Sequence, residues 1–281
     1  MKATSLKLTA LALAGILAMN VAKAQTAPAA APKAPEPDYT VSYNLGAVSD
    51  YRFRGISQTS KGAAIQGGAD VAFKNGAYLG AWASNVKWVR SFNGASKGQL
   101  ELDVYGGYKG QIAKDLTYDL GAIAYVYPGN NSGAAGTAGD GTTGTGGYVN
   151  ATTKEIYGAL TSGIYTAKYS RSVGTFLGFK ESSGSSYLDL SAAVDLGNSL
   201  TLTPHIGRQT VTGSTSGLSN GPMLSYTDYA LTLAKDMGNG LTLTAAATST
   251  NAKSVNYQES TDFGGKFISK SAFLVGAKYS F

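Results

Sequence analysis

The sequence predicts an all-β protein, a transmembrane antiparallel up-and-down β-barrel of about twelve strands with both termini on the periplasmic side. Three observations support this fold class. Apolar and polar residues alternate with period two along most of the chain, as in strands with two unlike faces. Short and long connections between these segments alternate strictly. After residue 24, no run of about 18 apolar residues could form a membrane-spanning helix.

The N-terminal residues predict export of the chain from the cytoplasm. Lys2 and Lys7 precede the apolar run Leu8–Met19, and Ala22-Lys23-Ala24 fits a signal-peptidase site. We therefore expect a signal peptide over residues 1–24, an Ala/Pro-rich periplasmic spacer over 25–37 and the barrel over 38–281. No cysteine is present to carry a lipid anchor.

Composition excludes several functional classes. The chain has no cysteine and one histidine, which excludes a disulfide scaffold and metal sites built from cysteines or several histidines. After the expected cleavage, twenty basic and seventeen acidic residues remain, and a net charge of +3 is too small to indicate nucleic acid as a partner. The stretches Gly55–Gly62 and Ala138–Gly147 fit neither a phosphate-binding nor a calcium-binding loop. We expect no cofactor.

The alternation assigns the strands. From Tyr39 to Phe53, the odd positions are mostly apolar or aromatic and the even positions are small or polar. Ten or fourteen strands remain possible, because one merged or split hairpin changes the count. The expected strands cover residues 39–53, 63–74, 77–86, 99–112, 116–127, 153–162, 164–178, 187–196, 200–210, 225–235, 241–249 and 267–281.

The connections favour an outer-membrane barrel over a secreted β-sandwich. Five are short, such as Asn75-Gly76, and six are longer, such as residues 128–152. Outer-membrane barrels join their strands by short periplasmic turns and longer outer loops. Tyrosines near strand ends fit interfacial girdles, and the terminal Phe281 resembles the signal read by the barrel assembly machinery. A sandwich would need a second apolar face, which the strands lack.

The motifs also carry a family resemblance. VSDYRFRGISQTSKGAAIQGGAD (Val48–Asp70) resembles the signature of the TorF family of proteobacterial porins. The chain departs from the family pattern in the insertion Asn130–Gly147 and in the Ala/Pro spacer. The resemblance implies an outer-membrane pore and names no solute. Further matching stretches are Tyr78–Val86, Glu101–Gly110, Tyr118–Gly129, Lys154–Leu160 and Thr227–Ala246.

Charged and polar side chains opposite the apolar face are expected to line the pore. A lipid-facing Arg or Lys would cost about 2–4 kcal/mol at the membrane midplane, which favours the inward face. Tyr125, Tyr127, Tyr157, Asp195, His205 and Lys278 share this phase. The predicted pore-lining residues are Asp50, Arg52, Arg54, Gln66, Asp70, Glu101, Asp103, Tyr105, Lys109, Asp119, Glu155, Lys168, Asp189 and Asp228.

Arg52 and Arg54 are the sharpest functional candidates. On one strand they would lie one pleat repeat, about 7 Å, apart and could face carboxylates across a narrow pore. The alternative is that such charges form buried ion pairs that fill the barrel. Tyr105, Tyr125 and Tyr127 could likewise guide sugars or fill space.

The most consistent function is a porin-like channel for passive diffusion of small hydrophilic solutes or ions. Expected partners are the outer-membrane lipid, lipopolysaccharide and the barrel assembly machinery. A non-conducting structural or adhesive barrel is the main alternative. An outer-membrane hydrolase is a weaker one, because His205 is the only histidine and no G-x-S-x-G motif is present. The sign of ion selectivity is left open.

Overall fold

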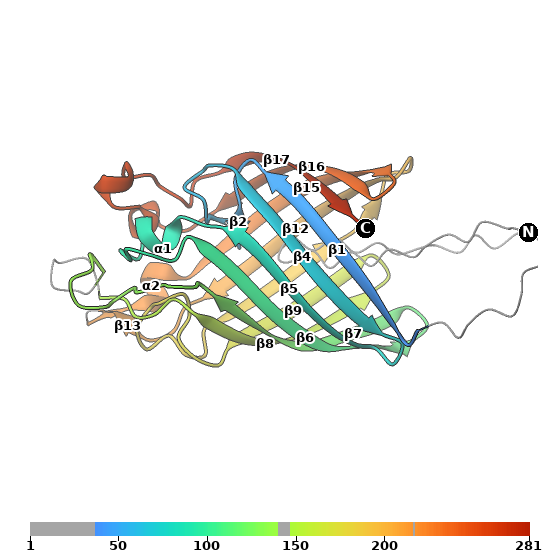
Figure 1. The fold of residues 1–281 in the computed structure, drawn as a ribbon, viewed down its shortest axis with the longest axis horizontal. Helices are drawn as coiled ribbons and strands as arrows, with labels where there is room; N and C mark the ends of the chain where they lie inside the picture. Colours follow the sequence, from blue (N-terminus) through green and yellow to red (C-terminus); the bar gives the residue numbers. More distant parts are fainter. Residues whose placement is uncertain (1–36, 140–146, 216) are drawn as a thin grey trace, which may run out of the picture.

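The computed structural model describes residues 37–139, 147–215 and 217–281, which form a closed antiparallel β-barrel of twelve strands (Figure 1). The expected signal peptide and residues 25–36 of the spacer lie outside the described residues. One barrel strand is interrupted and consists of β10 and β11. The strands are β1 (Tyr39–Val48), β4 (Ala64–Phe73), β5 (Ala77–Asn85), β6 (Leu100–Ala113), β7 (Leu116–Val126), β8 (Thr153–Ser162), β9 (Tyr165–Ser172), β10 (Ser186–Ala192), β11 (Val194–Asp195), β12 (Leu200–Thr210), β15 (Tyr226–Gly238), β16 (Leu241–Thr250) and β17 (Ala272–Ser280).

The first and last strands close the barrel. β1 pairs with β17 in antiparallel register, with Ala47 opposite Ala277, and its other edge pairs with β4. The remaining strands pair with their neighbours in chain order. Closure satisfies the backbone hydrogen bonds that an open sheet would leave unpaired at its edges, which is a requirement in lipid. The predicted up-and-down topology with twelve strands is confirmed.

Side chains on the two faces of the wall differ as the alternation predicts. Along β1, the odd positions from Val41 to Ala47 are exposed on the outside and the even positions are half-buried. The outward face carries large apolar side chains, whereas buried or half-buried polar side chains point inward on the same strands. Exposed outward examples are Leu45, Ile65, Leu79, Val104, Leu120, Ile156, Leu190, Leu231 and Val275.

Glycines on the inward face make room for tyrosine rings from neighbouring strands. Gly80 of β5 lies opposite Tyr105 of β6 in register, and a Cβ at Gly80 would approach the Tyr105 ring to 2.4 Å. The same relation holds at Gly121, where a Cβ would come within 2.5 Å of the Tyr157 hydroxyl. The rings therefore lie close against the wall. This arrangement accounts for part of the high glycine content, 37 of 281 residues.

Short turns and both described chain ends lie at one end of the barrel, and the long loops lie at the other (Figure 1). The loops carry α1 (Trp88–Ser91), the small hairpin β13 (Ser214–Thr215) and β14 (Leu218–Ser219), and α2 (Asn220–Leu224). The last loop contains the 3-10 turns η1 (Ser254–Tyr257) and η2 (Thr261–Phe263). Among the described residues, no helix is long and apolar enough to cross a membrane.

Three predicted strands are longer than the observed ones, each at the loop end of the barrel. The strand expected over 39–53 ends at Val48, the one over 164–178 ends at Ser172, and the one over 267–281 begins at Ala272. The excess residues belong to loops that fold over the barrel mouth and bury side chains there. Apolar and polar residues alternate in these loop segments as they do in strands, which explains the error.

The packing of tyrosines over glycines gives a first prediction. Gly80→Ala places a methyl group 2.4 Å from the Tyr105 ring and 2.6 Å from Asp70 Oδ1, and such overpacking costs about 1–3 kcal/mol. We expect a lower free energy of unfolding in urea titrations of the refolded barrel. Gly158→Ala is the matched control, since its nearest neighbour is one leucine methyl at 3.2 Å. Equal stability of both variants would contradict the packing account.

Candidate functional site

The connection between β1 and β4 folds into the barrel instead of outward. We call residues 49–61 the lumen hairpin; it contains β2 (Arg52–Phe53) and β3 (Ile56–Ser57), and its side chains are mostly buried. Arg54 and Gly55 form the two-residue turn between them, both with positive φ, at 49° and 79°. Such turns favour residues that tolerate positive φ, glycine above all. The prediction that Arg52 and Arg54 lie on one barrel strand is therefore wrong.

The tip of the hairpin reaches the wall at β15 and β16. A Cβ on Gly55 would lie 2.5 Å from Thr250 Cγ2 on β16 and 2.9 Å from Asp228 Cβ on β15. Only glycine fits this approach, and its positive φ gives a second reason for glycine here. The hairpin follows the end of β1 at the loop end of the barrel. It therefore narrows the lumen at that end.

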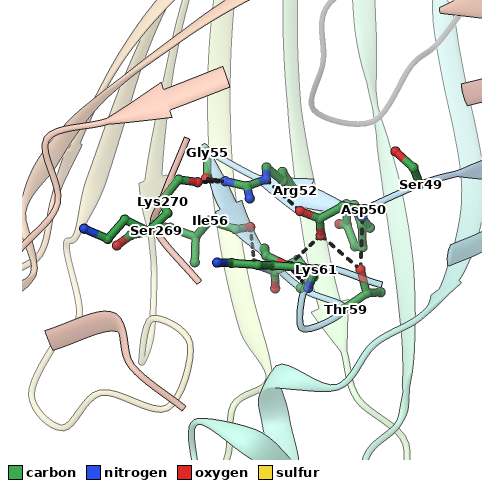
Figure 2. Close-up of polar contacts among 12 residues, drawn as sticks. Ser49, Asp50, Arg52, Gly55, Ile56, Thr59, Lys61, Ser269 and Lys270 are labelled. Atoms are coloured by element: carbon green, nitrogen blue, oxygen red, sulfur yellow. Dashed lines mark hydrogen bonds and ion pairs between the residues drawn. The ribbon is translucent and has the colours of Figure 1, made fainter. Parts of the chain in front are cut away.

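Asp50 organises the base of the hairpin (Figure 2). Its Oδ2 accepts a hydrogen bond from Arg52 Nε at 2.8 Å, and its Oδ1 accepts from Ser57 Oγ at 2.5 Å and from Thr59 Oγ1 at 3.2 Å. The Arg52 guanidinium also donates to the carbonyl oxygens of Gly55 and Lys270, at 2.9 and 2.7 Å. The Arg52 guanidinium thus joins the hairpin to the loop before β17.

Arg54 anchors the tip to the wall. Its Nη2 donates to Glu155 Oε2 on β8 at 2.7 Å, and its Nη1 donates to Gln209 Oε1 on β12 at 2.8 Å. The guanidinium carbon lies 4.3 Å from the centre of the Tyr187 ring. Burial alone would lower the pKa of Arg54, but Glu155 outweighs it and the pKa is raised above its ordinary value. The hairpin tip therefore carries a permanent positive charge.

Two further contacts hold the hairpin. The Tyr51 hydroxyl donates to Glu101 Oε1 on β6 at 2.6 Å, and burial, followed by Glu101, raises the pKa of Tyr51 well above its ordinary value. Glu259 accepts hydrogen bonds from Ser60 in the hairpin and from Ser91 at the end of α1. The hairpin is consequently tied to the wall and to two outer loops.

Aromatic and aliphatic side chains from the loops form a cap at the same end of the barrel. They pack on Phe53 and Ile56 of the hairpin, and Trp88 meets the Tyr127 ring edge-on at 5.2 Å between centroids. An apolar cavity of about 30 Å³ remains among them. Tyr125 and Tyr127 belong to this cap, which favours the space-filling alternative for these two rings. Other members of the cap are Val86, Val89, Phe176, Phe179, Leu224, Tyr226, Tyr257 and Ile268.

Nearer the turn end, the lumen wall is polar and partly accessible to solvent. Lys109 Nζ lies 3.6 Å from Asp119 Oδ2, and their side chains are 34% and 26% exposed. The Tyr78 hydroxyl donates to Asp119 at 2.6 Å, and the Tyr105 hydroxyl donates to Asp70 at 2.6 Å. The exposure of the lysine and the carboxylate indicates that water enters this part of the lumen.

His205 lies in a polar cluster on the wall that adjoins the hairpin tip through Tyr187 and Asp228. Its Nε2 is 3.0 Å from Asp228 Oδ1, and its Nδ1 is 3.4 Å from Asp189 Oδ2. The Tyr187 hydroxyl contacts both His205 and Asp228. Among the described contacts of His205 no serine hydroxyl appears. Across residues 37–139, 147–215 and 217–281, no group of acids and histidines is arranged to hold a metal ion.

The structure distributes the predicted site residues over three places. The hairpin holds Asp50, Arg52 and Arg54, all buried. Glu101, Asp103, Glu155, Asp189 and Asp228 lie buried on the wall. Half-buried wall positions are Gln66, Asp70, Tyr105, Lys109, Asp119 and Lys168. Their role in lining a conducting pore stays a prediction.

Sequence reasoning missed several contacts of the hairpin. Gln209 has the same inward phase as His205, so its position on the strand could have identified it as a lumen residue. Tyr51 was assigned to the apolar face, yet its hydroxyl bonds Glu101. Glu259 and Ser60 lie in long loops, where the alternation gives no signal, and Phe176 lies in a loop segment whose alternation predicted a strand.

The fold and this site define a closed β-barrel with an apolar exterior, a polar lumen and a hairpin lodged across the loop end. Residues 30–281 match the family described as "Bacterial protein of unknown function (Gcw_chp)", and the chain belongs to that family. The TorF name itself stays a prediction. A comparison with curated proteins gives no match.

Solved structures with a similar fold include outer-membrane transport proteins. A KdgM porin is 9% identical, covers 85% of this chain and 99% of its own, and has a TM-score of 0.48. A NanC porin is 10% identical with the same coverage and TM-score. The toluene transporter TodX of P. putida is 12% identical, covers 87% of this chain and 90% of its own, and has a TM-score of 0.44.

The contacts of Asp50 give a second prediction. Asp50→Asn leaves the Arg52 guanidinium buried without its carboxylate, and breaking a buried pair typically costs about 3–5 kcal/mol. We expect the hairpin to leave the lumen and expose Arg52 and Arg54 to trypsin. Limited digestion followed by mass spectrometry should detect cleavage after either arginine in the variant and none in the wild type. Asp195→Asn, an exposed position at the end of β11, is the control, and an equally resistant Asp50→Asn would contradict the anchoring role.

Proposed function

We propose that this protein is an outer-membrane channel for small hydrophilic solutes or ions, with the lumen hairpin as its constriction. The observation that carries the proposal is the pairing of an apolar exterior with a charged lumen that solvent reaches from the turn end. Lys109 and Asp119 remain partly exposed inside the barrel. Charged lumen residues set the selectivity of narrow pores.

Aromatic residues at both ends support a membrane position for the barrel. At the turn end, Tyr43 stacks on Phe281 at 5.7 Å between ring centroids, and Tyr39 contacts Phe73 at 6.4 Å. At the loop end, Phe273 is exposed on the outside. Two aromatic girdles that flank an apolar band are characteristic of outer-membrane barrels.

The distribution of outward charges supports the orientation with long loops outside. Lys154, Arg171 and Arg208 lie exposed on the outer face near the loop ends of their strands. Basic residues at this level suit the anionic head groups of lipopolysaccharide in the outer leaflet. The turn end, with Phe281, would then face the periplasm, where the assembly machinery acts.

The outer cap favours a second candidate, a barrel that does not conduct. Its side chains are buried to the level of a protein core, with Val89 and Ala151 fully inaccessible. A cap of this kind closes the loop end in the described state. The channel proposal therefore requires that the hairpin or the cap moves.

Conductance in a planar bilayer separates the two candidates. We expect the refolded wild-type barrel to show stepwise openings and, under a salt gradient, a non-zero reversal potential. The double variant Arg52→Ala/Arg54→Ala should show a larger single-channel conductance, because the hairpin loses both ion pairs. Folded wild-type and variant barrels without any openings would overturn the channel and leave the non-conducting alternative.

Substitutions on β15 test the membrane position. Leu231 faces outward near the middle of the strand and is 49% exposed, so Leu231→Lys should cost about 2–4 kcal/mol in a lipid bilayer. Ala230→Lys is the matched control, since Ala230 lies on the inward face, two residues from Asp228. Urea unfolding in phospholipid vesicles should show the larger loss for Leu231→Lys. Equal losses would argue against a lipid-facing exterior.

A further inference from the structure

Arg54 occupies a site that is built for a guanidinium group. The wall supplies Glu155 and Gln209 as acceptors, at 2.7 and 2.8 Å from two different nitrogens of the guanidinium. The Tyr187 and Phe176 rings lie 4.3 and 5.6 Å from its carbon. We call Glu155, Gln209, Tyr187 and Phe176 the cation cage. Paired acceptors fit the planar fork of a guanidinium, and aromatic faces attract a desolvated cation.

Glu155 in the cage keeps hydrogen-bonding capacity that Arg54 does not use. Glu155 is 1% exposed, and its Oε1 has no hydrogen-bond partner among the described residues. Asp103, on β6, is 5% exposed, has an unpartnered Oδ1 and interacts electrostatically with Glu155 and Glu101. Arg54 Nε is also unpartnered within the described chain. Groups of this kind normally find partners when buried, so the fit of Arg54 in the cage is incomplete.

Arg54 reaches the cage at a conformational cost. Its φ of 49° lies in the left-handed region, which a non-glycine residue seldom adopts. The hairpin also blocks the lumen of what we propose is a channel. A hairpin whose arginine occupies a site on the wall is arranged as an internal ligand.

We propose that the cation cage is a recognition site for a solute that carries a guanidinium or primary ammonium group, and that Arg54 occupies it as an internal competitor in the closed state. The recognition site stands on the geometry of the cage, whereas passage of the solute rests on the proposed channel function. The pore then accepts cationic organic solutes, which displace Arg54 from Glu155 as they enter.

Emptying the cage tests the site directly. Arg54→Gly removes the internal ligand and suits the positive φ of the turn. Methylguanidinium chloride is titrated by calorimetry into the refolded full-length barrel in detergent. We expect Arg54→Gly to bind it at least about ten times more tightly than the wild type, and Arg54→Gly/Glu155→Gln to lose at least about tenfold of that affinity. Methylurea, which has a similar shape but no charge, should not bind.

Two controls keep the outcome decisive. Arg208→Gly removes an exposed outward arginine and should bind like the wild type. Arg54→Asn repeats the measurement with another residue that tolerates positive φ, should Arg54→Gly fail to fold. A folded Arg54 variant that binds no better than the wild type, or a double variant that binds as well as the single one, overturns the proposal.

Currents separate this proposal from the channel function. Methylguanidinium is offered as the only cation on one side of a bilayer that contains Arg54→Gly. Binding in detergent without a methylguanidinium current in the bilayer supports the cage and overturns the passage of the cation through the barrel. Current without saturable binding supports the channel and overturns the cage.

Discussion

The pairing of β1 with β17 is the constraint on which the rest of the structure depends. It closes the sheet, so every strand has one face toward the exterior and one toward an enclosed lumen. Charges in the strand interiors must then face the lumen, because lipid penalises them. A barrel of twelve strands lies between small barrels filled by side chains and wide open porins. Protein side chains must therefore fill part of its interior, and water occupies the remainder.

The two ends of the lumen meet this requirement differently. At the turn end, tyrosines lie close against glycines and leave charged side chains partly in contact with solvent. At the loop end, a chain segment enters the lumen and brings two arginines with it. Burying ion pairs such as Arg52–Asp50 and Arg54–Glu155 costs desolvation free energy. Apolar side chains in their place would often stabilise the folded protein equally well. The use of charges here gives the hairpin a specific position that depends on a few contacts.

The sequence predicted the strands well because their signal is local. Period-two alternation and turn residues placed twelve strands, most within one or two residues of the observed bounds. The hairpin could not be predicted in this way, because Tyr51 and Phe53 continue the alternation of β1. Its position depends on contacts with Lys270, 218 residues from Arg52, and with Gln209, 155 residues from Arg54. The inward phase identified Glu155 as a lumen residue, but only the fold shows that it meets Arg54.

The most direct test of the account is the accessibility of the hairpin in the assembled barrel. The chain contains no cysteine, so single cysteines at Ile56 in the hairpin and at Val255 in an outer loop report on their own surroundings. Ile56 is 7% exposed and Val255 is 73% exposed. The account predicts that Ile56→Cys reacts with a membrane-impermeant maleimide at least about ten times more slowly than Val255→Cys, because buried thiols are inert. Equal rates in folded, membrane-inserted protein would show that the hairpin does not lie in the lumen.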